Sequence, residues 1–428
     1  MILSLKSRRR FMQLMGMSST ALILGDLLPN QHSVTVGASS AWVARHGLTS
    51  AQYESEFNKY TVNGEDRYAA IRESENGYKS SELQAINQTV AQFMQDYDVP
   101  GLSLAIAQDG RLVLAKTYGL ADKSTKERVT PRHRFRIASV SKPITAIAIM
   151  KLVEQGNLEL NDRVFGEGGI LGTTYGTTPY KTNVDQITVE HLLTHLGGGW
   201  SNDINDPMFS NLSMNQTQLI SWVLDNRPLD DVPGTKYAYS NFGYCVLGRV
   251  IEKVTGQIYE NYVTTNILQP SGVTDMQIGG DTLAQKKANE VTYYGQSGEN
   301  PYEMKVARMD AHGGWIAKPI DLVRLSVAVD GLNSKPDILG ASAIATMYQG
   351  SSVNSGYAKG WSVNQANNHW HNGSLPGEQA FIVNTSDGFS WAVLVNTRSQ
   401  KSDFGGDLDE LMWNIKSKVS TWPSFDLF

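Results

Sequence analysis

Ser139 and Lys142 are two residues whose types and spacing could do chemistry together. They lie three positions apart in the stretch FRIASVSKP at residues 135–143, and an apolar run follows them. The pattern predicts a buried helix from Ser139 to Gln155 that ends at Gly156, with only its first turn facing solvent. There the serine lies among free backbone N–H groups at the positive end of the helix dipole, and Lys142 projects from the same face. Burial lowers the pKa of an ammonium group, so Lys142 could accept the hydroxyl proton and make Ser139 a nucleophile.

A second candidate stretch, VPGTKYAYSNFGY at residues 232–244, contains a Pro-Gly turn followed by tyrosine, serine and asparagine. Either Ser240 or Asn241 is expected to cap a helix that ends at Gly256. Tyr239 and Asn241 would then lie at the entrance of that helix and face a cleft. A plain turn with a capping asparagine is the structural alternative for the same residues.

A third stretch, HWHNGSLPG, occupies residues 369–377, just before a predicted strand pair. Gly373 has no side chain, so it would let a substrate backbone approach closely at a strand edge. His371 could contribute to the same edge, although a packed or an exposed structural histidine fits the pattern equally well.

A metal site is the competing interpretation for His191 and His195, because two histidines four apart on a helix can share one ion. The zinc proteases with this spacing carry a general-base glutamate beside the first histidine, and here that position is Leu192. The sequence therefore disfavours a zinc protease, and we expect neither a metal nor an organic cofactor.

The elements that must position these residues come from both ends of the chain. Apolar residues at helical spacing predict a helix over 81–97. Two hairpins are predicted, one from strands 102–106 and 112–118 and the other from strands 379–384 and 390–396, each joined by an Asp-Gly turn. Strands at both ends with helical and loop-rich sequence between them predict an α+β fold. One antiparallel sheet would be built from both chain ends, flanked by helices, with a mostly helical insertion at about 160–320.

The N-terminal part is expected to differ from the main domain. Residues 1–41 combine a basic cluster, Arg8 to Arg10, with a moderately apolar run and then small residues, as a targeting segment does. The run from Ser7 to Phe11 resembles the twin-arginine export signal. Residues 42–80 are polar and form a linker or a shortened repeat module, and 81–428 form the main domain.

Composition excludes several classes of protein. The 428 residues are 41% hydrophobic and 18% charged, which is ample for a large core. With 37 Lys and Arg against 42 Asp and Glu, and with no basic stripe after the N-terminus, a nucleic-acid partner is not expected. The single Cys245 lies in an apolar run and is expected to be a buried, inert thiol. No run reaches membrane-spanning length, so no membrane span is expected in the mature protein.

Taken in order, Ser139 to Lys142, Tyr239 to Asn241 and His371 to Gly373 resemble the three motifs of the serine β-lactamases and penicillin-binding proteins. The branch is that of the class C β-lactamases, D-alanyl-D-alanine carboxypeptidases, D-aminopeptidases and related esterases, and the resemblance extends from about residue 81 to the end. Two pieces of the N-terminal part, 41–53 and 62–71, resemble the module repeated ahead of the catalytic domain in polyglycine hydrolases.

The resemblance implies a role for each position. Ser139 would be the acylated nucleophile, Lys142 its base or electrostatic partner, and Tyr239 the group that passes a proton to the leaving group. Asn241 would hydrogen-bond the acyl side of the substrate. At the third motif His371 and Gly373 would line the substrate site, and the backbone amides of Ser139 and Ser374 would form the oxyanion hole. Which of Lys142 and Tyr239 is the general base stays open, since the two would titrate as a coupled pair.

The chain departs from the family pattern at two places. Residues 196–199 read Leu-Gly-Gly-Gly, where relatives commonly carry Thr-Ser-Gly, and His371 replaces the lysine of the third motif. A histidine near its unperturbed pKa would hold a substrate carboxylate less reliably than an ammonium group. The resemblance therefore favours a peptidase or an esterase over an enzyme dedicated to destroying antibiotics.

We therefore expect a serine hydrolase, exported to the periplasm or the extracellular space, that cleaves amide or ester bonds through an acyl-serine intermediate. Its partner would be a small-molecule or peptide substrate, such as a D-amino-acid or cell-wall-type peptide or a small ester. Two alternatives stay open. One is a polyglycine-directed serine endopeptidase, suggested by residues 41–71, and the other is a noncatalytic penicillin-binding-like protein that keeps the fold. The sequence leaves the oligomeric state open.

Overall fold

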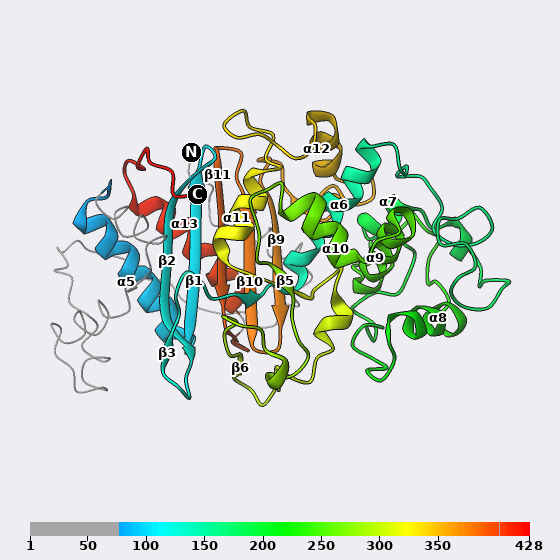
Figure 1. Ribbon diagram of the computed structural model, residues 1–428, viewed down its shortest axis with the longest axis horizontal. Helices are drawn as coiled ribbons and strands as arrows, with labels where there is room; N and C mark the ends of the chain where they lie inside the picture. The colour runs from blue at the N-terminus through cyan, green and yellow to red at the C-terminus, as the bar shows by residue number, and fades with distance from the viewer. Residues whose placement is uncertain (1–76, 402) are drawn as a thin grey trace, which may run out of the picture. The chain divides into compact units, whose positions relative to one another are not determined.

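A seven-stranded antiparallel sheet with helices packed around and beside it makes up the part of the chain that the computed structural model describes, residues 77–401 and 403–428 (Figure 1). The strands lie in the order β3-β2-β1-β11-β10-β9-β8. Their bounds in that order are Glu127–Arg128, Arg111–Asp122, Gly101–Gln108, Phe389–Val395, Glu378–Asn384, His369–Leu375 and Ser362–Val363.

The centre of the sheet is built from both ends of the chain, as the sequence predicts. Strand β1 pairs with β11 from Leu102 opposite Val395 onward, and each strand also belongs to one of the two predicted hairpins. Gly110 and Gly388 supply the positive φ angles that these tight turns need, +74° and +87°. The predicted α+β class and the antiparallel sheet are therefore confirmed.

Both faces of the sheet are covered. Every residue of β10 and β11 is buried, although alternate side chains of a strand point to opposite faces. Helix α11 (Pro319–Val327) contacts β1 and β11, while α13 (Phe404–Lys418) contacts β10, β11 and α5. Helix α5 (Ser80–Asp96) matches the helix predicted over 81–97.

A group of helices lies beyond β9, on the other side of the molecule from α5 (Figure 1). At its centre is α6, whose residues from Ser141 to Met150 are all buried, so each of its isoleucines contributes roughly 1.5–3 kcal/mol relative to exposure. Helix α6 contacts α9, α10 and α12. The bounds of the helices in this group are Ser141–Glu154 (α6), Val189–Leu193 (α7), Gln216–Asn226 (α8), Asn241–Thr255 (α9), Tyr259–Val263 (α10), with a π-helical turn at Thr264–Leu268, and Ala341–Tyr348 (α12).

Short elements connect the sheet to this helical part. A small three-stranded sheet has the order β4 (Phe135–Arg136), β7 (Trp315–Ala317) and β5 (Gln277–Ile278), and β12 (Thr397–Arg398) pairs with β6 (Tyr294–Gly295). Single 3₁₀ turns lie at Ala138–Val140, Val184–Gln186, Leu283–Gln285 and Val306–Met309.

The export signal predicted for residues 1–41, and all but the last residues of the segment 42–80, lie outside the described residues. Among the helices of 77–401 and 403–428, none is long and apolar enough to cross a lipid bilayer.

Candidate active site

Ser139 lies on a single turn of 3₁₀ helix between strand β4 and helix α6. The sequence predicted that α6 would begin at Ser139, but the α-helix begins at Ser141. The reason is the backbone at Ala138, whose φ of +42° is one that L residues seldom adopt, followed by the tight bond from the Val140 N–H to the Ile137 carbonyl. The turn leaves Ser139 partly exposed while its neighbours Ala138 and Val140 are buried. A strained residue of this kind is a recurrent feature of functional sites.

Lys142 is fully buried, and its amine is aimed at the serine. Its Nζ donates to Ser139 Oγ at 2.9 Å, to Asn241 Oδ1 at 2.6 Å and to the His312 carbonyl at 3.1 Å. Burial lowers the pKa of Lys142 from 10.5 to about 7, and the nearby Asp206 opposes that shift. A lysine with this pKa is neutral in a large fraction of molecules near neutral pH, so it can take a proton from the serine hydroxyl.

Tyr239 lies beside the same amine, at the start of α9. Ser240 is the N-cap of α9, and its Oγ accepts from the Gly243 N–H at 3.1 Å, so the cap is the serine of the two candidates. The ring centroid of Tyr239 is 4.8 Å from Lys142 Nζ. Burial raises the pKa of Tyr239 far above its ordinary value, although a hydrogen bond with Ser139 acts in the opposite direction. Its phenol is therefore neutral and can donate a proton.

The sequence predicted that Asn241 faces a cleft, but in the structure its side chain is buried, with only 4% of the residue exposed. Its Oδ1 accepts from Lys142 at 2.6 Å, and its Nδ2 donates to Asp206 Oδ2 at 2.7 Å. Both ends of the carboxamide are thus engaged by the protein itself. The sequence pattern placed Asn241 at the start of α9 but did not reveal that its carboxamide is buried and contacts Lys142.

His371 is a buried, neutral residue. The expectation of a pKa near the unperturbed value is wrong, because burial and the nearby Lys142 lower the pKa of His371 to about 3. Nδ1 lies 2.7 Å from the Asn372 carbonyl, which can only accept, so Nδ1 carries the proton and Nε2 accepts from the Tyr357 hydroxyl at 3.1 Å. This imidazole adds no positive charge to the site.

Gly373 brings strand β9 close to the nucleophile turn. A Cβ atom at this position would lie 2.1 Å from the Ile137 carbonyl oxygen and 3.1 Å from the Ala138 side chain. Glycine is therefore needed here so that β9 can contact residues 137–138. The sequence instead predicted that a substrate backbone would occupy this space. Ser374, the next residue, is exposed on the same strand, where it pairs with Gln379.

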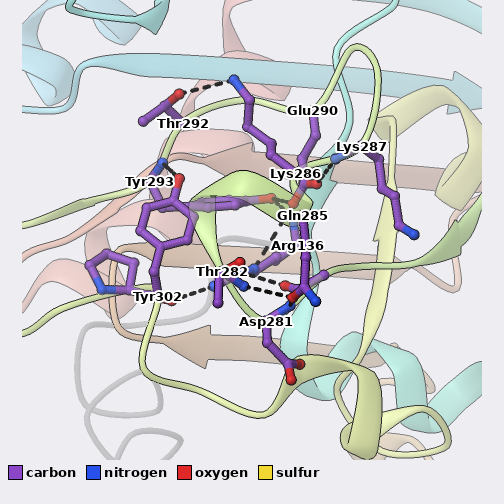
Figure 2. A network of polar contacts seen from close by, with 12 residues as sticks. Arg136, Asp281, Thr282, Gln285, Lys286, Lys287, Glu290, Thr292, Tyr293 and Tyr302 are labelled. Atoms are coloured by element: carbon purple, nitrogen blue, oxygen red, sulfur yellow. Dashed lines mark hydrogen bonds and ion pairs between the residues drawn. The ribbon is translucent and has the colours of Figure 1, made fainter.

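A buried network holds the chain just before the nucleophile turn (Figure 2). Arg136 Nη1 donates to the Pro301 carbonyl at 2.6 Å and Nη2 to the Gly280 carbonyl at 3.0 Å. Its guanidinium carbon lies 4.5 Å from the ring centroid of Tyr293, a cation–π distance. The Tyr293 hydroxyl accepts from the Arg136 N–H at 2.7 Å and donates to Glu290 at 2.8 Å. The segment 280–302 thus anchors β4 and, through it, Ser139.

A family model described as beta-lactamase matches residues 86–411, about three quarters of the chain. The chain belongs to the beta-lactamase family. Members of this family are serine hydrolases, and the segment that carries the Ser139, Lys142, Tyr239 and Asn241 cluster lies inside the matched range.

Individual relatives agree with the beta-lactamase assignment. Protein flp of Staphylococcus aureus is 26% identical over 335 residues, which cover 74% of this chain and 64% of that protein, so the chain spans less than two thirds of its length. The octameric penicillin-binding protein homologue from Pyrococcus abyssi is 25% identical with a TM-score of 0.62, covering 79% of each chain. D-amino acid amidase from Ochrobactrum anthropi has a TM-score of 0.64 at 21% identity, covering 79% of this chain and 98% of its own, and shows likeness of fold.

The N-terminal resemblance is also confirmed. A model described as a polyglycine hydrolase-like structural repeat matches residues 39–64, which precede the beta-lactamase range. This range lies outside the described residues.

Two residues near Tyr239, His195 and Asp206, lie outside the three sequence motifs. His195 packs against Tyr239 with ring centroids 4.2 Å apart and ring planes tilted by 41°, and its Nδ1 accepts from the Ser240 N–H at 3.1 Å. Asp206 comes from the loop between α7 and α8, where composition indicates no particular contact. Asp206 is found only by following contacts in space, and the sequence indicated His195 only as a possible metal ligand.

His191 and His195, the two candidate metal ligands, each use the Nδ1 atom within the protein. His191 Nδ1 accepts from the Thr188 N–H at 3.2 Å, and His195 Nδ1 is occupied by Ser240. Across residues 77–401 and 403–428, no group of three or more His, Cys, Asp or Glu side chains is arranged to hold an ion.

Proposed function

We propose that the chain is an exported serine hydrolase that cleaves amide or ester bonds through an acyl enzyme on Ser139. The observation that carries the proposal is the buried Lys142 amine, 2.9 Å from Ser139 Oγ, with a pKa of about 7. Lys142 is the general base, because burial favours its neutral amine, whereas burial makes the ionised form of Tyr239 the costlier one.

The residues divide the reaction into two steps. Ser139 Oγ attacks the carbonyl carbon while its proton passes to Lys142, and the backbone N–H groups of Ser139 and Ser374 bind the oxyanion. The tetrahedral intermediate collapses, Tyr239 donates its proton to the leaving group, and Lys142 restores that proton to Tyr239. Water then attacks the acyl group by the same route, which releases the acid and returns Ser139 to its hydroxyl form.

Relatives and the charge of the site support a substrate class. D-amino acid amidase and the penicillin-binding protein homologue support D-amino-acid or cell-wall-type peptides, and small esters fit the same chemistry. Neutral His371 offers no cation to a substrate carboxylate. We therefore place amides and esters with neutral flanking groups ahead of substrates that carry a carboxylate beside the scissile bond.

A second candidate is a polyglycine-directed endopeptidase, favoured by the repeat matched at residues 39–64. Deletion of residues 41–71 should lower cleavage of polyglycine linkers and leave hydrolysis of a short ester unchanged. Equal rates on polyglycine with and without the segment would remove the reason for this candidate.

The deciding measurement is the intact mass of the protein after reaction with a fluorophosphonate. In that reaction the Ser139 Oγ–P bond forms, the P–F bond breaks, the hydroxyl proton passes to Lys142 and fluoride leaves. We expect a single adduct on the wild type and on Ser141→Ala, a matched control for the buried neighbouring serine, and none on Ser139→Ala. An unlabelled wild type, or label on Ser139→Ala, would contradict the proposal.

A parallel incubation with a penicillin separates the substrate classes. A persistent penicillin adduct would support a penicillin-recognising peptidase, and hydrolysed drug would support a β-lactamase. If the penicillin forms no adduct and is not hydrolysed, while fluorophosphonate still labels the protein, short esters and polyglycine become the next substrates to test. If Ser139→Ala still hydrolyses esters, Ser139 is not needed for turnover, and the noncatalytic alternative remains open for this serine.

A further inference from the structure

We infer that Asp206 is a positioning residue of this hydrolase, which orients the Lys142 amine toward Ser139 by holding the carboxamide of Asn241. The inference rests on the proposed function, because it concerns how Ser139 is activated. None of the three sequence motifs contains Asp206.

The contacts form one continuous chain of hydrogen bonds. Asp206 Oδ2 accepts from Asn241 Nδ2 at 2.7 Å, Asn241 Oδ1 accepts from Lys142 Nζ at 2.6 Å, and Lys142 Nζ donates to Ser139 Oγ at 2.9 Å. Asp206 is 7% exposed, and Lys142 is fully buried. Solvent therefore competes little for the inner bonds of the chain.

The order of donors and acceptors allows one arrangement. An ionised carboxylate can only accept, so it requires the NH₂ end of Asn241, and the carbonyl end must then face Lys142. If the amide turned over, two donors would meet at Lys142 and two acceptors at Asp206. Asp206 thus decides which end of Asn241 faces the lysine. The neutral amine can give its two protons to Asn241 Oδ1 and the His312 carbonyl, which leaves its lone pair for the Ser139 hydroxyl.

The loop that carries Asp206 is held in place from outside. Arg227 donates to the carbonyls of Ile204 and Asn205 at 2.9 and 2.6 Å, just before Asp206. Arg308 donates to the Met208 carbonyl at 2.7 Å, just after it. The Met208 N–H also donates to Asp206 Oδ1 at 2.8 Å, so each carboxylate oxygen has its own donor.

Charge acts together with this geometry. The carboxylate of Asp206 favours the protonated form of Lys142 and so raises its pKa against the effect of burial. Burial keeps the three histidines near Lys142 neutral, with pKa values below their ordinary range. The charged and titratable groups around the pair are Arg227, Arg308 and Tyr239 beside Asp206, and Tyr239, Tyr244, His195, His312 and His371 beside Lys142.

The test is the rate of fluorophosphonate labelling measured over a pH range on both sides of 7. Asp206→Asn removes the negative charge, so the pH at which labelling is half-maximal should fall by about one unit, and the plateau rate should fall roughly tenfold as the amide loses its fixed orientation. Asp206→Glu keeps the charge but shifts the carboxylate, so it should restore the wild-type midpoint while its plateau stays low. Asp203→Asn removes an exposed charge from the same loop and should change neither value.

Thermal melting of each variant, measured beside the kinetics, shows whether a slow variant is folded. A folded Asp206→Asn protein with the wild-type midpoint would overturn the inference. If that variant does not melt cooperatively, Asp206→Glu decides, and a plateau within about twofold of wild type would show that carboxylate placement is unimportant. A wild type that is not labelled at all would refute the proposed function instead, which keeps the two failures apart.

Discussion

At the scale of single residues, protonation is what turns a pair of common side chains into a reactive one. Ser139 and Lys142 differ from an ordinary surface pair because Lys142 is fully buried, which brings its pKa to about 7. The same burial keeps Tyr239 protonated and His371 uncharged. In the proposed mechanism these residues serve as one base, one acid and one neutral imidazole.

The first prediction concerns the pH dependence of acylation. The pKa of Lys142 in the folded protein lies below its ordinary value, so its neutral form dominates above about pH 7 and is lost as the pH falls. Labelling of Ser139 should thus decline about tenfold for each pH unit below 7. A stopped assay of fluorophosphonate labelling against pH would measure this limb.

Tyr239→Phe is the control for that assignment. It removes a neutral phenol, so the midpoint near pH 7 should remain although the turnover of esters falls. A midpoint that disappears in Tyr239→Phe would show that Lys142 is not the titrating base. A wild-type midpoint close to the ordinary lysine pKa would contradict the lowered pKa of Lys142.

At the scale of elements, the contact between strand β9 and the nucleophile turn decides the geometry. Gly373 lets β9 lie against Ile137 and Ala138, and Arg136 anchors the other side of the turn to the segment 280–302 (Figure 2). The turn carrying Ser139 is thus held between two elements that are far apart in the sequence.

The second prediction is that Gly373→Ala damages the site more than the fold. Its Cβ would lie 2.1 Å from the Ile137 carbonyl oxygen, so β9 or the turn must move. Stability should fall by roughly 1–3 kcal/mol, and labelling of Ser139 should slow by about 100-fold, because a displacement near 1 Å is enough to misalign the serine. Urea denaturation and labelling kinetics measure the two effects.

Gly405→Ala is the matched control, because its Cβ would meet nothing nearer than a Gln379 side-chain nitrogen at 3.7 Å. Gly405 lies in helix α13, where alanine is the better helix former, so this variant should gain up to about 1 kcal/mol and label normally. Normal labelling of Gly373→Ala would contradict the role given to the close contact.

At the scale of the whole molecule, ionisable side chains from distant parts of the chain are buried close together. Glu378 begins strand β10 and is fully buried, near Arg136 of β4 and Arg398 of β12. Burial raises the pKa of Glu378 from 4.5 to about 8, and the two arginines only partly oppose that shift. The folded protein therefore holds this carboxyl group in its protonated form at neutral pH.

The third prediction follows from that raised pKa. The folded state binds the proton more tightly than the unfolded chain, so the resulting stability is fully present below about pH 4.5 and is lost as the pH rises toward 8. Glu378→Gln cannot ionise, so its Tm relative to wild type should rise by a few degrees across this range. Thermal melts of both proteins at a series of pH values test this.

The exposed Glu303→Gln substitution removes the same kind of group without a buried partner, and its Tm should follow the wild type at every pH. A Tm difference between Glu378→Gln and wild type that stays constant with pH would mean that Glu378 ionises as an exposed carboxyl does.

The sequence by itself determined the elements and the identity of the central residues. Hairpins with Asp-Gly turns, the amphipathic helix now seen as α5 and the apolar run of α6 depend on local patterns of polarity and turn chemistry, which act over a few residues. The spacing of Ser139 and Lys142 on one helical turn predicted their contact for the same reason.

Only the tertiary structure decided how those residues are charged and oriented. The burial that neutralises His371, the carboxamide of Asn241 turned toward Lys142, and the contact of Gly373 with Ile137 all depend on segments that lie about a hundred residues or more apart in the sequence. Asp206 is the clearest case, since its loop has no periodicity, and its partner Asn241 lies 35 positions away. Desolvation and hydrogen-bond direction are properties of the packed surroundings, so no local pattern in the sequence could specify them.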